Sequence, residues 1–270
     1  MEFEEELKKL LEEWREEAGK IDKSLLPLVD KFIKANEGGK RIRGKLVMLG
    51  YEIAVAEDGR RKTEDILKVA AAYEIFHTAI LVHDDIIDQD LIRRGQPSLY
   101  QALGGNHQGT SLAICLADAG FFLAVKIIAE SNFPQKRKNE ALKYFSGIIL
   151  DTAMGQMLDI EKGDYLTVAK YKTAEYSVSG PLILGAILDG AKLDQLGKLD
   201  QFGEYLGIAF QIQDDILDGE VAWIRGLDSA KNEAKKYKNK AMKVIPEITK
   251  DPKTSKLLRQ MAEYLIERNK

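Results

Sequence analysis

The chain has 270 residues, of which 45% are hydrophobic and 31% are charged, and its formal net charge is −3. This composition suits a soluble globular protein, and the near balance of charge gives no overall reason to bind nucleic acid or an anionic membrane. The single cysteine, Cys115, excludes an internal disulfide and a cysteine-based zinc site. We expect it to be a small buried residue in a cytoplasmic protein.

Helical periodicity runs through the sequence, and the alternation typical of strands is nearly absent. The expected helices cover residues 3–18, 24–36, 40–56, 63–89, 109–130, 134–162, 166–191, 194–218, 227–245 and 253–268. Ser179-Gly180-Pro181 predicts a kink within one of them. The most apolar stretch, 111–129, contains Asp118 and Lys126, which favours a buried core helix over a membrane span. Without a linker or repeat, residues 1–270 predict one all-α domain.

The helix expected over 63–89 ends in an acidic cluster, LVHDDIIDQD. Asp84 and Asp88 lie four residues apart and share a face, with Asp85 beside them. Like charges at this spacing destabilise a helix, and carboxylates near its C-terminus oppose the helix dipole. Since the neighbouring residues are apolar, the carboxylates must take up protons or bind cations. Oxygen ligands of this kind predict Mg²⁺.

The helix expected over 194–218 ends in the same way, in FQIQDDILDGE, with carboxylates at Asp214, Asp215 and Asp218. By residue frequency, one DDxxD pattern arises by chance in roughly one chain of this length in thirty, and two in on the order of one in a thousand. Two solvated acidic helix ends are the alternative interpretation. The Ile and Leu residues around both clusters argue against it.

Two basic runs complement the acidic clusters. Lys40 and Arg43 of GGKRIR share a face at the start of the helix expected over 40–56, where free N–H groups and the helix dipole also attract anions. Arg93 and Arg94 follow the first acidic cluster and can bind phosphate in a bidentate manner. Either run alone is more often a solvated surface, but beside two metal-type clusters both predict diphosphate binding.

With these motifs in order, the chain resembles the trans-isoprenyl diphosphate synthases from about Gly38 to Asp218. The resemblance includes HTAILVHDDIIDQDLIRRGQPS, GQMLD (Gly155 to Asp159), Lys172-Thr173 and GIAFQIQDDILD. It implies an antiparallel helical bundle around a deep central cavity, a homodimer, and three Mg²⁺ ions per site, with Mn²⁺ as an alternative. The implied reaction joins isopentenyl diphosphate to an allylic diphosphate to give a longer all-trans prenyl diphosphate.

The resemblance also implies residue roles. The metal ligands would be Asp84, Asp88, Asp214, Asp215 and Asp218. The allylic diphosphate would be bound by Arg93, Lys172, Thr173 and Gln211, and isopentenyl diphosphate by Lys40, Arg43, His77 and Arg94. The catalytic residues would be Asp84, Asp85, Asp88, Arg93, Lys172 and Asp214. His77 taken alone is as consistent with a core histidine.

Product length is predicted from the helix that leads to Asp84. In the trans-isoprenyl diphosphate synthases, bulky residues just upstream of the first acidic motif form the floor of the space that holds the growing prenyl chain. Here Ile80 and Ala79 occupy the fourth and fifth positions before Asp84, and Ala79 leaves that level open. Phe76 and Tyr73 lie one and two helical turns deeper, at about 5 Å per turn. A product of about C20, geranylgeranyl diphosphate, or longer is therefore expected, although both aromatics also suit an ordinary core.

The chain departs from the family pattern in several places. Gly44 stands where proline is usual, Tyr100 where histidine is usual, and Ala117 precedes Asp118 where glycine is usual. After Asp218 the family's lysine-containing loop and some later helices are missing, which puts rate and site closure in doubt. Two other functions stay open: a non-catalytic subunit of a two-component synthase, and a terpene cyclase with the same metal chemistry.

Overall fold

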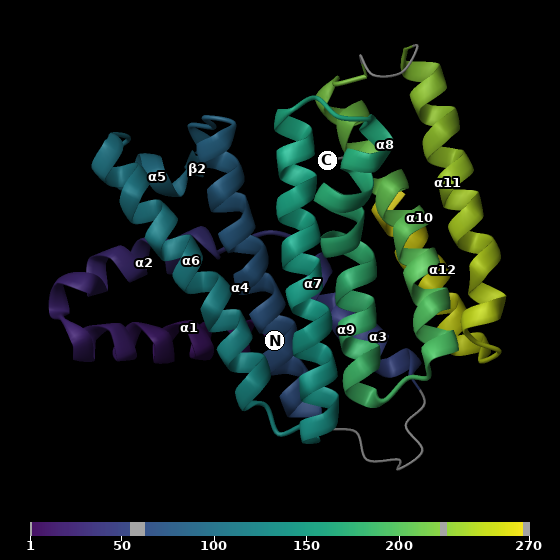
Figure 1. The fold of residues 1–270 in the computed structure, drawn as a ribbon, viewed down its shortest axis with the longest axis horizontal. Helices are drawn as coiled ribbons and strands as arrows, with labels where there is room; N and C mark the ends of the chain where they lie inside the picture. The colour runs from purple at the N-terminus through teal and green to yellow at the C-terminus, as the bar shows by residue number, and fades with distance from the viewer. Residues whose placement is uncertain (1, 55–62, 222–225, 267–270) are drawn as a thin grey trace. The chain divides into compact units, whose positions relative to one another are not determined.

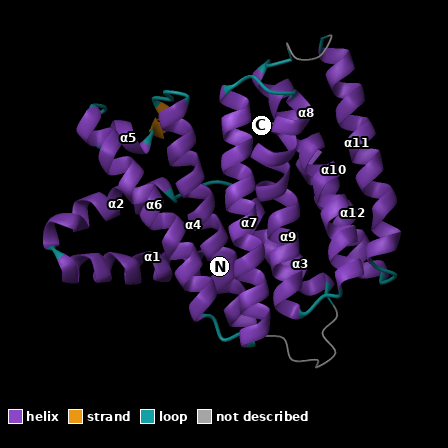
Figure 2. Ribbon diagram, in the orientation of Figure 1, coloured by secondary structure: helices purple, strands orange, loops and turns teal. Residues whose placement is uncertain are grey.

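The computed structural model describes residues 2–54, 63–221 and 226–266. Within these ranges nearly all regular structure is helical, and the strands are two residues each, β1 (Ile92–Arg93) and β2 (Gln96–Pro97) (Figure 2). This confirms the all-α fold class. The chain divides into two compact units, Met1–Lys45 with Lys62–Phe133, and Leu46–Arg61 with Pro134–Lys270. We call them unit 1 and unit 2. A single domain over 1–270 stays a prediction.

Unit 1 is built on two long helices that pack along each other, α4 (Thr63–Ile87) and α6 (His107–Glu130) (Figure 1). Its other helices are α1 (Glu2–Ile21), the 3₁₀ turn η1 (Lys23–Leu25), α2 (Leu26–Ala35) and the short α5 (Leu99–Ala102). The fully buried Tyr73 and Phe76 of α4 meet edge to face at 5.5 Å, and Phe76 lies 5.6 Å from the ring of Phe121 on α6. This aromatic packing holds α4 against α6.

Unit 2 contains α7 (Gln135–Ile160), α8 (Tyr165–Val168), the π-helix η2 (Ala169–Ser179), α9 (Gly180–Asp189), α10 (Leu193–Asp218), α11 (Leu227–Ile248) and α12 (Pro252–Ile266). In Figure 1, α7, α9 and α10 lie side by side, with α11 next to α10. Gly155 of α7 and Gly207 of α10 allow close approach to η2. A side chain at Gly155 would lie 2.3 Å from the backbone nitrogen of Lys172, and one at Gly207 would lie 2.5 Å from Ala174 Cα. Two glycines therefore position the segment that carries Lys172.

The structure differs from several of the predicted helices. The helix expected over 166–191 is three consecutive segments, α8, η2 and α9, and the change from π- to α-helix falls at Gly180, beside Pro181. The helix expected over 40–56 is α3 (Ile42–Ile53), which begins in unit 1 and continues into unit 2, and residues 55 and 56 lie outside the described residues. The last residues of the helix expected over 253–268 also lie outside them.

The apolar helix α6 is less buried than expected. Both α4 and α6 are long and apolar enough to cross a membrane, but 72% of the apolar window of α4 is buried, against 39% for α6. Cys115, expected to be buried, is exposed on α6, and so is Phe122, with 75% of its surface accessible. The expectation of a small buried cysteine is therefore wrong. The helix buries one side against α4, and its other side presents apolar residues.

Candidate active site

The two acidic helix ends are built alike, each within its own unit. In both, the first acid is half-buried, the second is buried and the last is exposed. These residues are Asp84, Asp85 and Asp88 around the end of α4, and Asp214, Asp215 and Asp218 at the end of α10. The next residue, Gln89 or Gly219, is left-handed, with φ of 58° or 81°. The residue after it donates its N–H to the carbonyl of the second acid, at 2.9 Å in unit 1 and 2.8 Å in unit 2.

In unit 1 the acids share one arginine. Arg93 Nε donates to Asp85 Oδ1 at 2.6 Å, and its Nη2 donates to Asp90 Oδ2 at 3.0 Å and lies 3.8 Å from Asp84 Oδ2. Burial raises the pKa of Asp85, and the bond from Arg93 opposes that rise. Arg93, predicted to bind a diphosphate, is therefore already the internal counter-ion of the first motif.

A β-hairpin sets the directions of the two adjacent arginines. β1 and β2 are antiparallel, with Arg93 opposite Gln96, and the turn residues Arg94 and Gly95 have φ of 53° and 74°. Two left-handed residues match a type I′ turn. The guanidinium of Arg94 lies against Gly39, where a side chain would be 3.2 Å from its Cζ, and donates to the carbonyl of Glu37 at 3.3 Å. The hairpin thus brings Arg94 to the glycine loop before α3.

His77 lies among the cations of unit 1. Its Nε2 is 3.1 Å from Arg43 Nη1. Because the guanidinium stays protonated and can only donate, Nε2 is the acceptor, and Nδ1 is assigned the proton. Burial lowers the pKa of His77 well below its ordinary 6.5, and the charges of Arg43 and Arg94 add to the effect. His77 is therefore neutral at physiological pH and orients Arg43.

The three cations of the GGKRIR motif differ: Arg41 has structural contacts, whereas Lys40 and Arg43 are accessible. Arg41 is buried with φ of 53°, and its Nε donates to Glu4 Oε1 at 2.8 Å. Glu74 Oε1 accepts the N–H of Gly44, in the first turn of α3, at 2.8 Å. The expectation that this helix start offers free N–H groups is therefore wrong for Gly44. Lys40 is exposed and Arg43 half-buried, so these two of the motif's cations remain accessible.

A cavity of about 700 Å³ lies in unit 1 beside the arginines of the hairpin. Among the residues that line it are Gly38, Gly39, Asp85, Arg93 and Arg94. Burial lowers the pKa of Arg94, and the nearby charges of Arg41 and Arg43 lower it further. A depressed arginine pKa means that positive charge is crowded there, so an anion in this region would be stabilised.

In unit 2 the predicted residues form two groups. Lys172 Nζ, on η2, pairs with Asp159 Oδ2 of α7 at 2.6 Å, and the next residue, Thr173, is buried. Gln211 Nε2 donates to Asp215 Oδ1 at 2.7 Å. Lys172 is thus held by an acid of the GQMLD motif, and Gln211 by an acid of the second DDxxD motif.

Sequence reasoning missed Tyr165 of α8. Its hydroxyl donates to Asp215 Oδ2 at 2.5 Å, so both carboxylate oxygens of Asp215 accept hydrogen bonds within unit 2. Burial, and then the bond to Asp215, raise the pKa of Tyr165 above its ordinary value. No sequence signal joins residues 50 positions apart, because the contact depends on how α8 packs near the end of α10.

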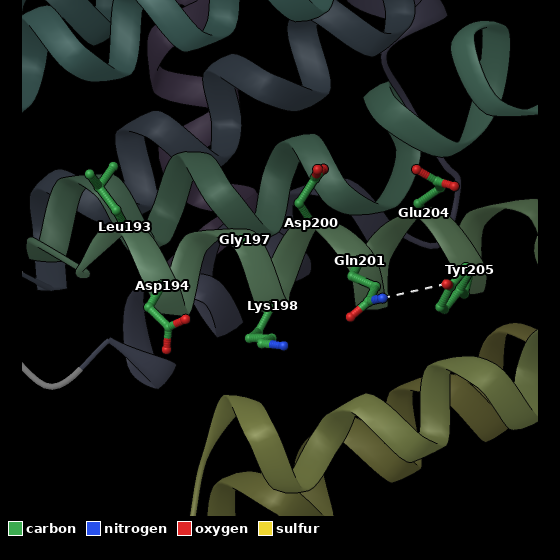
Figure 3. Close-up of a pocket in the computed structure, with 8 residues that line it drawn as sticks. All are labelled: Leu193, Asp194, Gly197, Lys198, Asp200, Gln201, Glu204 and Tyr205. Carbon is green, nitrogen blue, oxygen red and sulfur yellow. Dashed lines mark hydrogen bonds between the residues drawn. The ribbon is translucent and has the colours of Figure 1, made fainter.

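A groove of about 530 Å³ runs along the first half of α10 (Figure 3). It is lined by Leu193, Asp194, Gly197, Lys198, Asp200, Gln201, Glu204 and Tyr205. Gln201 Nε2 lies 3.4 Å from the hydroxyl of Tyr205. Tyr205 precedes Asp214 by nine residues, or roughly 14 Å along the helix. We therefore do not assign the groove to the candidate site.

The exposed acids suit a metal that is only partly enclosed by protein. Among the residues that the structure describes, no three acids, histidines or cysteines gather closely enough to hold a metal ion alone. Mg²⁺ is typically bound by one or two carboxylates and completes its octahedron with water and phosphate oxygens. Asp84 with Asp88, and Asp214 with Asp218, have the four-residue spacing that would let two carboxylates of one helix end hold such an ion together.

The model of the polyprenyl synthetase family matches residues 26–222, which contain both acidic motifs, both basic runs and Lys172. The chain belongs to this family. Geranylfarnesyl diphosphate synthase of Methanosarcina mazei is 32% identical over 226 residues, which are 77% of this chain and 70% of the relative. Short chain isoprenyl diphosphate synthase of Methanothermobacter thermautotrophicus is 32% identical over 67% of this chain, but the match covers only 54% of that relative. The chain thus spans about half the length of some curated relatives.

A solved structure has the same fold over nearly the whole length. A geranylgeranyl pyrophosphate synthase from Corynebacterium glutamicum, complexed with isoprenyl diphosphate and magnesium, superposes with a TM-score of 0.88. It shares 20% identity, and the superposition covers 99% of this chain and 98% of that one. At this identity the likeness establishes the fold.

The depressed pKa of His77 predicts a pH dependence of stability. Below pH 6.5 the unfolded chain takes up a proton at His77 that the folded chain does not, so unfolding becomes easier as pH falls. Through His77, the free energy of unfolding should fall by up to about 1.4 kcal/mol per pH unit. We expect His77→Gln to abolish this contribution. Denaturant unfolding between pH 7.5 and 5.5 measures it, and His107→Gln, at an exposed histidine, should keep the wild-type slope. Equal slopes for all three proteins would contradict a buried neutral His77.

Proposed function

We propose that this chain is a Mg²⁺-dependent prenyltransferase that condenses isopentenyl diphosphate with an allylic diphosphate. One observation carries the proposal: two acidic helix ends with the same burial pattern occur in a chain that also holds a crowded group of arginines around a neutral histidine. The acids call for divalent cations, and the arginines call for an anion. A diphosphate bridged by metal and a second diphosphate bound without metal satisfy both requirements. The matched relatives are diphosphate synthases by name.

The exposed and half-buried acids are the proposed metal ligands, namely Asp84, Asp88, Asp214 and Asp218. Asp85 and Asp215 support them from buried positions. Mg²⁺, or Mn²⁺ in its place, would supply Lewis acidity toward the leaving diphosphate, and three ions per site are proposed from the family resemblance. The protein's part is to hold these carboxylates at the ends of two rigid helices.

The cations are divided between two substrates. Arg93, Lys172, Thr173 and Gln211 are proposed to bind the allylic diphosphate, and Lys40, Arg43, His77 and Arg94 to bind isopentenyl diphosphate. Arg93 and Lys172 each pair with an acid, so each would exchange an internal carboxylate for phosphate oxygens. Neutral His77 keeps Arg43 oriented without adding a charge. In unit 1 the left-handed turn aims Arg94 at the glycine loop.

The proposed chemistry follows from charge. Loss of diphosphate leaves an allylic carbocation, and fixed guanidinium and ammonium groups stabilise the negative charge that grows on the departing group. The double bond of isopentenyl diphosphate attacks the cation, and a proton then passes to the departed diphosphate. Apolar residues next to the acids, such as Ile86 and Ile216, keep water from the cation.

The direct test is turnover by the purified chain alone with Mg²⁺, labelled isopentenyl diphosphate and each short allylic diphosphate. We expect an elongated prenyl diphosphate, and a fall in kcat of roughly 100-fold or more for Asp84→Asn and for Asp214→Asn, because each removes a metal ligand. Asp194→Asn, at an exposed acid near the start of α10, is the matched control and should leave kcat unchanged. An inactive wild type would favour a non-catalytic subunit, and release of a hydrocarbon or alcohol would favour a cyclase.

The chain-length proposal is a product of about C20. Phe76 is fully buried one turn below Ala79 and is held between Tyr73 and Phe121. If its ring is the floor, Phe76→Ala should lengthen the main product by about one isoprene unit, since one helical turn is about 5 Å. Tyr73→Phe, which keeps the ring, should leave the product unchanged. Chromatography of the dephosphorylated products measures both, and the same product from Phe76→Ala would remove Phe76 as the floor.

We also propose a cytoplasmic homodimer. The outer side of α6 exposes Phe122 and Ile114, and a long apolar helix with such a face is more stable when covered. Sedimentation should give twice the mass of one chain for the wild type. Phe122→Asp should shift the mass toward one chain, whereas Leu193→Asp, at an exposed leucine of α10, should not. A monomeric wild type at micromolar concentration would contradict the proposal.

A further inference from the structure

The second acid of each motif is an anchor, but the two motifs anchor it differently. In unit 1, the buried Asp85 is held by the charged Arg93. In unit 2, the buried Asp215 accepts bonds from Tyr165 Oη and Gln211 Nε2, which are both neutral donors. Asp215 was predicted as a metal ligand. Its burial and its two short hydrogen bonds fix it against its own unit, which suits a supporting role beside Asp214 and Asp218.

Tyr165 also lies at a junction of the fold. It is the first residue of α8, whose start is capped by Asp164, since Asp164 Oδ2 accepts the N–H of Thr167 at 3.0 Å. α8 continues directly into η2, the segment that carries Lys172. The bond from Tyr165 to Asp215 therefore ties the start of the lysine-bearing segment to the last turn of α10. That turn also carries Asp214 and Asp218.

We propose that Tyr165 is a positioning residue of the second metal-binding motif, acting through Asp215. This inference rests on the proposed function. Asp215 is about 100° around the helix from Asp214, so fixing Asp215 against Tyr165 sets the direction in which Asp214 and Asp218 point. Removing a group that hydrogen-bonds to a carboxylate at a metal site typically weakens metal affinity 10- to 100-fold. Tyr165 would act in this way through Asp215.

A second consequence concerns the diphosphate. Because α8 runs straight into η2, the same hydrogen bond helps to fix Lys172 relative to Asp214 within unit 2. A diphosphate bridged by metal to Asp214 must also reach the ammonium group of Lys172. Tyr165 thus fixes the distance between the metal-binding acid and the phosphate-binding lysine, and its loss should weaken metal binding most when a pyrophosphate is present.

The test removes the hydroxyl alone, with Tyr165→Phe. We expect the Mg²⁺ concentration for half-maximal rate to rise about tenfold. Calorimetric titration of the protein with Mn²⁺ in the presence of inorganic pyrophosphate should show weaker binding by a similar factor. Asp215→Asn should have a comparable effect. The double variant should be no worse than Asp215→Asn, because both changes remove the same interaction.

The matched control is Tyr144→Phe. Tyr144 is a half-buried tyrosine of α7 whose hydroxyl hydrogen-bonds to the side chain of Ser179, away from the motif. It should lower the melting temperature as much as Tyr165→Phe does, while leaving the Mg²⁺ dependence unchanged. If Tyr165→Phe lowers the melting temperature but leaves both the Mg²⁺ dependence and Mn²⁺ binding at wild-type values, its role is structural and the inference is wrong.

Failure of the proposed function gives a different result. A wild type that does not elongate any allylic diphosphate would refute the synthase, but the calorimetric titration with Mn²⁺ and pyrophosphate can still be made. Weaker binding by Tyr165→Phe would then support the positioning role in a binding protein. Equal binding by the wild type and the variant would overturn it.

Discussion

Crowded negative charge at the ends of two apolar helices is the constraint on which the rest of the site depends. Three carboxylates in one turn repel one another, and each cluster lies where the helix dipole also disfavours anions. The two clusters reduce this repulsion in different ways. Arg93 brings a positive charge into the first cluster, whereas neutral hydroxyl and amide groups hold Asp215 in the second. In both clusters the last acid is exposed, so a cation from solvent can reach it.

The helices were predictable because their periodicity and their end signals agree. The predicted boundaries of α4, α7 and α10 are within two residues of those in the structure, and both acidic motifs fall at helix ends as expected. The π-helical stretch was not predictable. Its hydrogen-bonding register depends on packing against Gly155 and Gly207, which lie on two other helices. The strands of the hairpin were missed because two residues are too short for an alternating pattern.

The local placement of residues was predictable where one element carries the pattern, and it was not predictable where several elements meet. The shared face of Asp84 and Asp88 follows from helical spacing alone. The division of labour within GGKRIR does not, because Arg41 faces inward only on account of Glu4 and Glu74, which come from two other helices. Tyr165 was not predicted for the same reason, because its contact with Asp215 joins two elements. The burial of Cys115 was predicted wrongly because local hydrophobicity does not say which side of α6 is covered.

The turn between β1 and β2 puts stability and function in conflict at one residue. Arg94 has a φ of 53°, and a left-handed conformation costs an ordinary side chain roughly 1–2 kcal/mol compared with glycine. Selection for heat resistance alone would therefore favour a second glycine beside Gly95. Such a chain would have a less strained turn but would lack the guanidinium. A thermostable descendant that keeps arginine at this position would therefore indicate that the cation is needed despite its strain.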